Sequence, residues 1–142
     1  MTTKLRYQLS AETCVKGNHW KYKIQLMLRE YGYHVVNIKN DTIHFELEKK
    51  GWGSNISQLG KADGGTIKII ELENGSMIVL TYYINLIYNI LLLTVFILFT
   101  FYFGWAVLFL VLGWVLLTFL QLLITKVRHQ DLLKEIMEKD SF

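Results

Sequence analysis

The most constraining feature of this sequence is a long stretch without charge. No Asp, Glu, Lys or Arg occurs between Glu73 and Lys126, although charged residues make up 19% of the chain. A helix of about 20 apolar residues crosses a bilayer core about 30 Å thick. The uncharged stretch is therefore long enough for two transmembrane helices. We expect them at about residues 85–103 and 105–125, as a helical hairpin over residues 85–125 that turns at Gly104.

The charges that follow the second expected helix predict its orientation. Lys126 and Arg128 come directly after it, and basic residues beside a membrane helix favour the cytoplasmic side. Two spans return the chain to the side from which it started. We therefore expect a multi-pass protein of the inner (plasma) membrane with the N- and C-termini in the cytoplasm. A hairpin that dips into one leaflet without crossing is the alternative, because almost no loop separates the two helices.

The region before the hairpin, residues 1–84, predicts a soluble α+β domain. Apolar residues alternate with polar ones over residues 5–9, which is the period of a strand. Apolar spacings of three and four residues then predict a helix over about residues 11–31, ending at Gly32. With the two hairpins that follow, the expected fold is a small N-terminal antiparallel sheet with one helix, in the order β-α-β-β-β-β.

Two β-hairpins are expected after this helix. The first turns at Asn40-Asp41 and places Val36 opposite Phe45. The second turns at Asn74-Gly75, because an Asn-Gly pair readily accepts the positive φ that a two-residue turn requires. The glycine-rich segment over residues 51–65 is expected to be a loop, with one short strand inside it.

The second hairpin is apolar on both faces, and a single helix covers only one of them. We expect Ile69 and Leu80 to lie in the core. The opposite face is a candidate partner surface, made of Ile70, Leu72, Met77 and Val79. Its cover would be the membrane, the C-terminal tail or another chain. A sheet that curls into a small barrel is the alternative.

The charged tail, residues 126–142, is expected to form a short amphipathic cytoplasmic helix after the hairpin. Its apolar residues make one narrow stripe: Leu132, Leu133, Ile136 and Met137. This tail stripe is a candidate to cover the second face of the sheet.

Polar side chains inside the expected membrane helices predict how those helices pack. Buried amides in lipid need hydrogen-bond partners. If the hairpin turns about Trp105, Asn89 and Gln121 share one depth, and Asn85 and Thr125 share another at the hydrocarbon boundary. We expect an interhelical Asn89–Gln121 contact that sets the register of the hairpin. The alternative directs both amides toward another subunit.

No arrangement of residues in the sequence indicates catalysis, a cofactor or a metal. The four histidines are scattered, the only cysteine is Cys14, and a net charge of +3 is too small to indicate nucleic-acid binding. The sequence thus predicts a non-enzymatic integral membrane accessory or scaffold protein in the lipid bilayer. Its cytoplasmic domain would bind a protein partner, a second copy or the membrane surface. The alternatives are a self-assembling pore-forming or membrane-perturbing effector, and an enzyme at the membrane surface.

Overall fold

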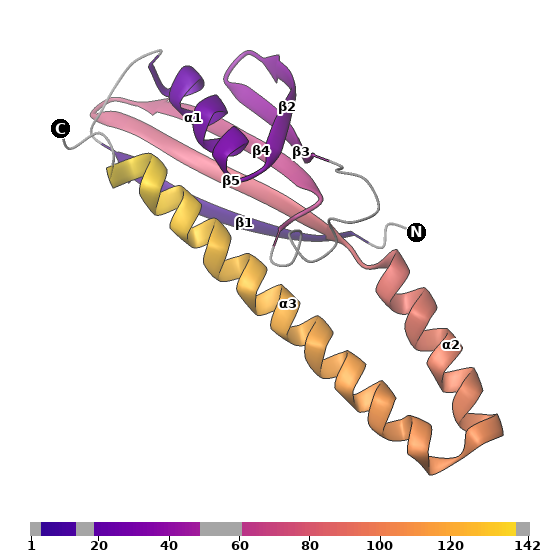
Figure 1. Ribbon diagram of the computed structural model, residues 1–142. Helices are drawn as coiled ribbons and strands as arrows, with labels where there is room; N and C mark the ends of the chain where they lie inside the picture. The colour runs from indigo at the N-terminus through magenta and orange to yellow at the C-terminus, as the bar shows by residue number, and fades with distance from the viewer. Residues whose placement is uncertain (1–3, 14–18, 49–60, 139–142) are drawn as a thin grey trace.

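The computed structural model of the chain describes residues 4–13, 19–48 and 61–138. These residues form five strands and three helices (Figure 1). In chain order they are β1 (Lys4–Thr13), α1 (His19–Glu30), β2 (Tyr33–Lys39), β3 (Thr42–Leu47), β4 (Gly64–Leu72), β5 (Gly75–Asn85), α2 (Ile87–Phe103) and α3 (Trp105–Glu138). The short strand expected inside the glycine-rich segment lies outside the described residues.

The strands form one antiparallel sheet in the order β1-β5-β4-β3-β2. The first strand of the chain therefore pairs with the last, from Lys4 opposite Asn85 to Thr13 opposite Ser76. This pairing extends β1 through residues 11–13, which we expected to begin the helix. The backbone groups of these three residues bond to β5 instead, and α1 begins only at His19. It ends as expected before Gly32, whose φ of 82° suits glycine.

The β2–β3 hairpin confirms the expected turn and corrects the expected register. Lys39 pairs with Thr42, so Asn40 and Asp41 form a two-residue turn, and Asn40 has a φ of 54°. A register shift between Val35 and Asn37 then places Val35 opposite Phe45. Val36, which we expected at that place, is 54% exposed. A bulge of this kind adds one residue to one strand and changes the face of those beyond it.

The β4–β5 hairpin turns one residue earlier than expected. Leu72 pairs with Gly75, so the turn is Glu73-Asn74. This shift changes each residue's partner by two positions, which preserves the face on which its side chain lies. Ile69 and Leu80 are accordingly buried, as expected. Gly65, which we expected in a loop, belongs to β4, where any Cβ atom would collide with the backbone oxygen of Thr81.

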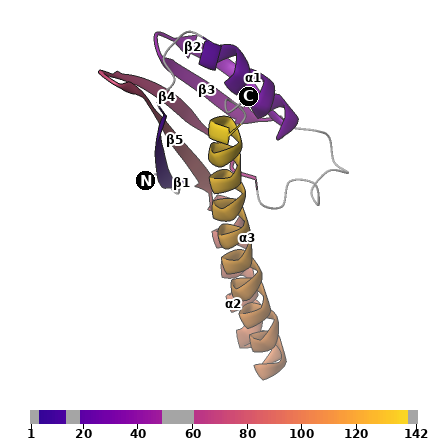
Figure 2. The same cartoon turned by 90° about the vertical axis from the view of Figure 1, so that its left-hand side faces the viewer.

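The hydrophobic core lies on one face of the sheet only. Both α1 and the C-terminal part of α3 cover this face, and Figure 2 shows the two helices on the same side of the strands. The core combines side chains from α1, the strands and α3: Trp20, Ile24, Met27, Leu28, Ile43, Phe45, Ile67, Ile78, Leu80, Tyr82, Leu132 and Ile136. The tail stripe therefore packs with α1 on the core face and leaves the opposite face open.

The expected small sheet, two-helix transmembrane hairpin and separate tail helix are wrong as a description of this fold. Five strands of up to 11 residues form more than a small N-terminal sheet, and the tail is the end of α3, which runs unbroken for 34 residues. In the described part of the chain, only α3 is long and apolar enough to cross a membrane. Because β5 continues to Asn85, α2 keeps 17 residues, or about 26 Å, which is short of a 30 Å core.

Candidate functional site

The most organised group of side chains lies where α3 meets the sheet. The buried residues of α3 are Thr125, His129, Leu132, Leu133 and Ile136. Their spacing of three and four residues places them on one face of the helix. The N-terminal half of α3, by contrast, contains an 18-residue apolar window of which nothing is buried. One continuous helix thus joins an exposed apolar segment to the core of the sheet.

His129 forms the polar centre of this junction. Its Nδ1 lies 2.7 Å from the backbone oxygen of Thr125, one turn earlier in α3. A carbonyl oxygen only accepts, so Nδ1 carries the proton and Nε2 of the neutral ring is an acceptor. The hydroxyl of Tyr33, 3.0 Å from Nε2, donates to it, and the backbone N–H of Ala62 donates to the Tyr33 oxygen at 2.9 Å. The hydrogen bonds therefore run from Ala62 through Tyr33 and His129 to Thr125.

Burial keeps the side chains of this junction neutral. Burial lowers the pKa of His129, and the neighbouring Arg128 lowers it further, against the hydrogen bond to Thr125, which raises it. Burial also raises the pKa of the Tyr33 hydroxyl. A neutral imidazole and a protonated phenol are the forms that the hydrogen-bond directions require. We refer to Tyr33, Ala62, Thr125 and His129 as the histidine junction.

Aromatic stacking adds to the histidine junction from the sheet side. The ring of Tyr82 on β5 stacks on His129 with centroids 4.2 Å apart and planes at 17°. Tyr7 on β1 stacks on Tyr82 in turn, at 5.4 Å and 20°. Buried aromatic pairs in such offset arrangements contribute beyond the area that they bury. The rings thus connect the edge strand, the last strand and α3.

A second contact ties the end of α1 to α3. The hydroxyl of Tyr31, which directly follows α1, donates to a carboxylate oxygen of Glu135 at 2.9 Å. The guanidinium of Arg128 lies 5.9 Å from the centroid of the Tyr31 ring, which is within cation–π range. Burial raises the pKa of the Tyr31 hydroxyl most, and its hydrogen bond to Glu135 raises it further. The C-terminal part of α3 is therefore held by contacts with both α1 and the strands.

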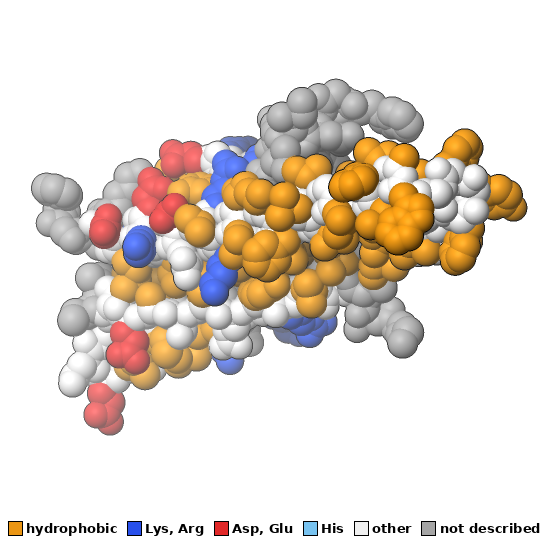
Figure 3. All heavy atoms as spheres, turned by 90° about the horizontal axis from the view of Figure 1, so that it is seen from below, with side chains coloured by type: hydrophobic (Ala, Val, Ile, Leu, Met, Phe, Trp, Pro, Cys, Tyr) orange, Lys and Arg blue, Asp and Glu red, His pale blue; other side chains and the backbone are white. Residues whose placement is uncertain are grey.

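Beyond the junction, α2 and α3 form a helical hairpin with exposed apolar sides. Gly104 makes the turn with a φ of 71°, and the rings of Phe96 and Trp114 pack edge to face with centroids 6.2 Å apart. A groove of about 290 Å³ lies between the helices, lined by Leu86, Asn89, Ile90, Leu93, Trp114, Val115, Thr118, Phe119 and Leu122. Figure 3 shows hydrophobic side chains over this hairpin, with the charged ones gathered over the sheet and its covering helices.

The threonines of the hairpin bond to their own helix. The hydroxyls of Thr94, Thr118 and Thr125 each donate to the backbone oxygen four residues earlier, at 2.8 to 2.9 Å. In lipid, where water is absent, this leaves a hydroxyl satisfied without any external partner.

The four polar residues predicted to matter in the hairpin do not form one cluster. Thr125 belongs to the histidine junction. Asn85 is the last residue of β5, and its side-chain oxygen accepts the backbone N–H of Ile87, the first residue of α2, at 3.1 Å. Asn89 and Gln121 are both half-buried, and Asn89 lines the groove. In the described residues no hydrogen bond joins these two amides, so a register-setting contact between them stays a prediction.

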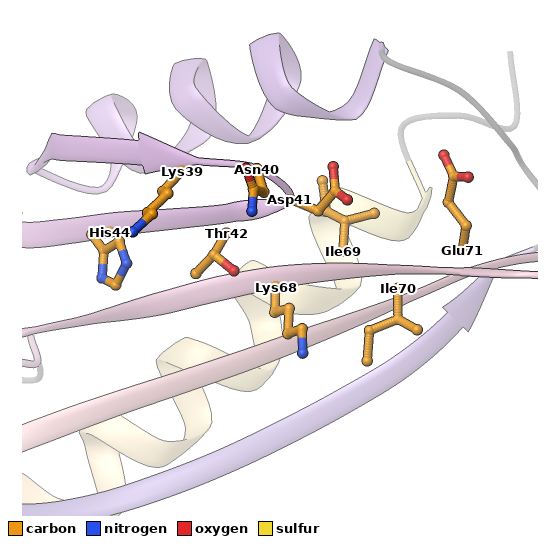
Figure 4. Close-up of a pocket in the computed structure, with 9 residues that line it drawn as sticks. All are labelled: Lys39, Asn40, Asp41, Thr42, His44, Lys68, Ile69, Ile70 and Glu71. Carbon is orange, nitrogen blue, oxygen red and sulfur yellow. The ribbon is translucent and has the colours of Figure 1, made fainter.

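The candidate partner surface lies on the open face of the sheet. Ile70, Met77 and Val79 are half-buried there, and Leu72 at the hairpin end is 40% exposed. Beside them is a hollow of about 610 Å³ that includes Lys39, Thr42, His44, Lys68 and Ile70. Figure 4 shows these five side chains pointing away from α1, while Ile69 and Glu71 point toward the side of α1.

Sequence reasoning missed the histidine junction. We treated His129 as one of four scattered histidines and gave Tyr33 no role. One signal was available, because Thr125, His129, Leu132 and Ile136 follow the spacing of a single helix face. The partners of His129 on β2 and β5 are distant in sequence and could not be read from local pattern. In the described part of the chain, no group of three or more His, Cys, Asp or Glu residues could hold a metal ion.

Comparison of the chain with protein families, curated proteins and solved structures finds no match to any of them.

Proposed function

We propose that this protein is a membrane-anchored accessory or scaffold protein. The apolar half of α3 lies in the bilayer with α2 packed against it, and the sheet is held at the membrane surface to bind a partner protein. The observation that carries this proposal is the division of α3 into an exposed apolar half and a half buried in the core of the sheet. A core helix of a soluble protein would be buried throughout, and a cleaved signal sequence would contribute nothing to the core.

The side chains of α3 support this assignment. Most of its exposed positions before Thr125 are large and apolar, for example Phe109, Leu116 and Phe119, with exposed fractions of 76%, 62% and 58%. Lys126 is the first charged residue after them. Exposed apolar surface of this extent on a soluble monomer would cause association, whereas acyl chains cover it in a bilayer.

The basic residues at the end of the apolar segment favour the cytoplasmic side for the sheet. Lys126 and Arg128 follow directly, and basic residues are retained on that side. The end of α3 packs on the sheet, so the sheet and the C-terminal part of α3 share one side of the membrane. We therefore propose a location at the cytoplasmic face of the inner (plasma) membrane.

Membrane fractionation of matched variants tests the proposed function. The wild-type chain should remain with membranes in alkaline carbonate and be released only by detergent. Leu116→Arg places a charge in the apolar segment, at a cost of about 2.5–3.5 kcal/mol if the residue lies near the bilayer centre, and should reduce the membrane-bound fraction. Gln130→Arg introduces the same side chain at an exposed position later in α3 and should change nothing. Release of the wild-type chain by carbonate would contradict the proposal.

A further inference from the structure

The open face of the sheet carries an excess of positive charge. The register places four basic side chains on it, Lys4 and Arg6 on β1, Lys39 on β2 and Lys68 on β4, against Glu12 and Glu46. Lys39 and Lys68 line the same hollow. Four basic against two acidic side chains give this face a net charge of +2, compared with +3 for the whole chain.

The two lysines of the hollow form no ion pair within the described residues, although Asp41 and Glu71 also line it. Asp41, at the rim, forms an ion pair with Lys21 on α1 at 3.2 Å. Glu71 lies on the same stretch of β4 but points to the opposite side of the sheet from Lys68 (Figure 4). In the part of the chain that the structure describes, no ion pair joins Lys39 or Lys68 to a carboxylate.

An apolar strip lies directly beside these basic groups. Ile70 neighbours Lys68 on the same side of β4, and it pairs with Met77 on β5. Val79, opposite Lys68, continues the strip. A second hollow of about 500 Å³ extends across the same face past His44 and Thr66 to Tyr83 and Arg6. The face therefore offers apolar contact near the β4–β5 hairpin, with Lys68 and Lys39 beside it toward β2 and Glu12 beside it on β1. Lys4 and Arg6 lie toward the opposite end of the sheet, beside Asn85 and Tyr83.

The direction of the open face argues against the bilayer as its cover. In Figure 2 the open face looks sideways, whereas α2 and α3 run downward from one end of the sheet. A bilayer that contains the apolar half of α3 meets the end of the sheet and not its face. The face is thus presented to proteins beside the anchor.

We propose that the open face docks an acidic amphipathic segment of a partner protein. Apolar side chains of the segment would pack on Ile70, Met77 and Val79, and its carboxylates would pair with Lys39 and Lys68. Complementary charge of this kind gives specificity and steers association. The inference rests on the partner-binding role in the proposed function and adds the chemistry of the partner.

A peptide-binding experiment on the full chain tests this inference. The chain is placed in phosphatidylcholine nanodiscs, and fluorescence anisotropy measures binding of a labelled peptide with Leu and Glu at helical spacing. A second peptide carries Lys in place of each Glu, and empty nanodiscs give the lipid background. The test variant is Lys39→Glu with Lys68→Glu. The control variant, Arg29→Glu with Lys134→Glu, makes the same change at exposed positions of α1 and α3, off the open face.

The chain should bind the acidic peptide above background, and bind the basic peptide more weakly. The test variant should weaken binding of the acidic peptide about tenfold, or about 1.4 kcal/mol, while the control variant leaves it unchanged. Equal binding of the two peptides, equal loss in both variants, or no binding above empty nanodiscs would overturn the inference. Pairing of two copies through this face, seen as a doubled mass that Val79→Ser abolishes, would also overturn it. Failure of the membrane anchor is seen separately, as release by carbonate.

Discussion

Removing the hydroxyl of Tyr33 should weaken the attachment of α3 to the sheet. Tyr33→Phe deletes the donor to Nε2 of His129 and the acceptor for the N–H of Ala62. Both of these atoms lie in buried residues, since His129 is 1% exposed and Ala62 is fully buried. A buried polar atom that loses its partner costs about 1–3 kcal/mol. Two such losses are partly offset because the Phe ring is more apolar than the Tyr ring and its burial is more favourable. We therefore expect the free energy of unfolding to decrease by about 2–4 kcal/mol.

Urea unfolding in a mild detergent, followed by near-UV circular dichroism, measures this change. Tyr22→Phe is the matched control, because Tyr22 is 70% exposed on α1 and should give a change near zero. The double variant Tyr33→Phe with His129→Leu should lose less than the sum of the two single variants, since the partners share one hydrogen bond. A Tyr33→Phe variant within about 0.5 kcal/mol of wild type would refute the reasoning that the histidine junction holds α3.

Three further predictions concern pH, the core and topology. Because burial lowers the pKa of His129 below its usual value near 6.5, the unfolded chain binds the proton more readily than the folded chain. The stability contribution of the histidine junction should therefore be complete above about pH 6.5 and fall as the pH drops below it. In His129→Gln, the free energy of unfolding, measured at a series of pH values, should lack this decrease. Leu80→Ala should cost about 2–5 kcal/mol, measured by urea unfolding against the exposed-site control Leu26→Ala, and a cost under about 0.5 kcal/mol would place Leu80 outside the core. A C-terminal fusion to a reporter that works only in the cytoplasm should be active. Activity of a reporter that works only outside the cell, fused at the same place, would refute the proposed orientation.

Side-chain alternation was sufficient to predict which residues of β4 and β5 face the core. Ile69 and Leu80 are buried although the turn lies one residue from its expected place. Alternation has a period of two, so a shift that changes partners by two preserves the face. Local turn chemistry likewise predicted the Asn40-Asp41 turn and the end of α1 at Gly32. These features depend on neighbours in sequence.

The features that could not be predicted depend on partners distant in sequence. β1 continues to Thr13 because β5 offers it backbone partners more than sixty residues later, and this pairing overrides the local helical pattern. Strand β5 itself continues to Asn85, and this leaves α2 too short for a full membrane span. The tail stripe was recognised as one helix face, but the face of the sheet that it covers depends on how α3 returns from the hairpin.

The candidate site follows the same division. The apolar residues of the open face were recognised from the hairpin pattern. Lys39 and Lys68 come together on that face only because the sheet order places β3 between β2 and β4. His129 acquires its role only when α3 packs across β5 and β2. The sequence pattern identifies the faces, and the three-dimensional pairing determines what each face meets.

The central claim, that α3 passes from lipid into the core of the sheet, is tested most directly by spin-label accessibility along this helix. Single nitroxides are placed at exposed positions from Ala106 to Gln130 in the Cys14→Ser chain, in nanodiscs. Labels before Thr125 should be relaxed by oxygen, which partitions into lipid, and protected from a water-soluble nickel reagent. Labels at Lys126 and beyond should show the reverse. Access of the nickel reagent along the whole segment from Ala106 to Ile124 would contradict the account, since it would place the apolar half of α3 in water.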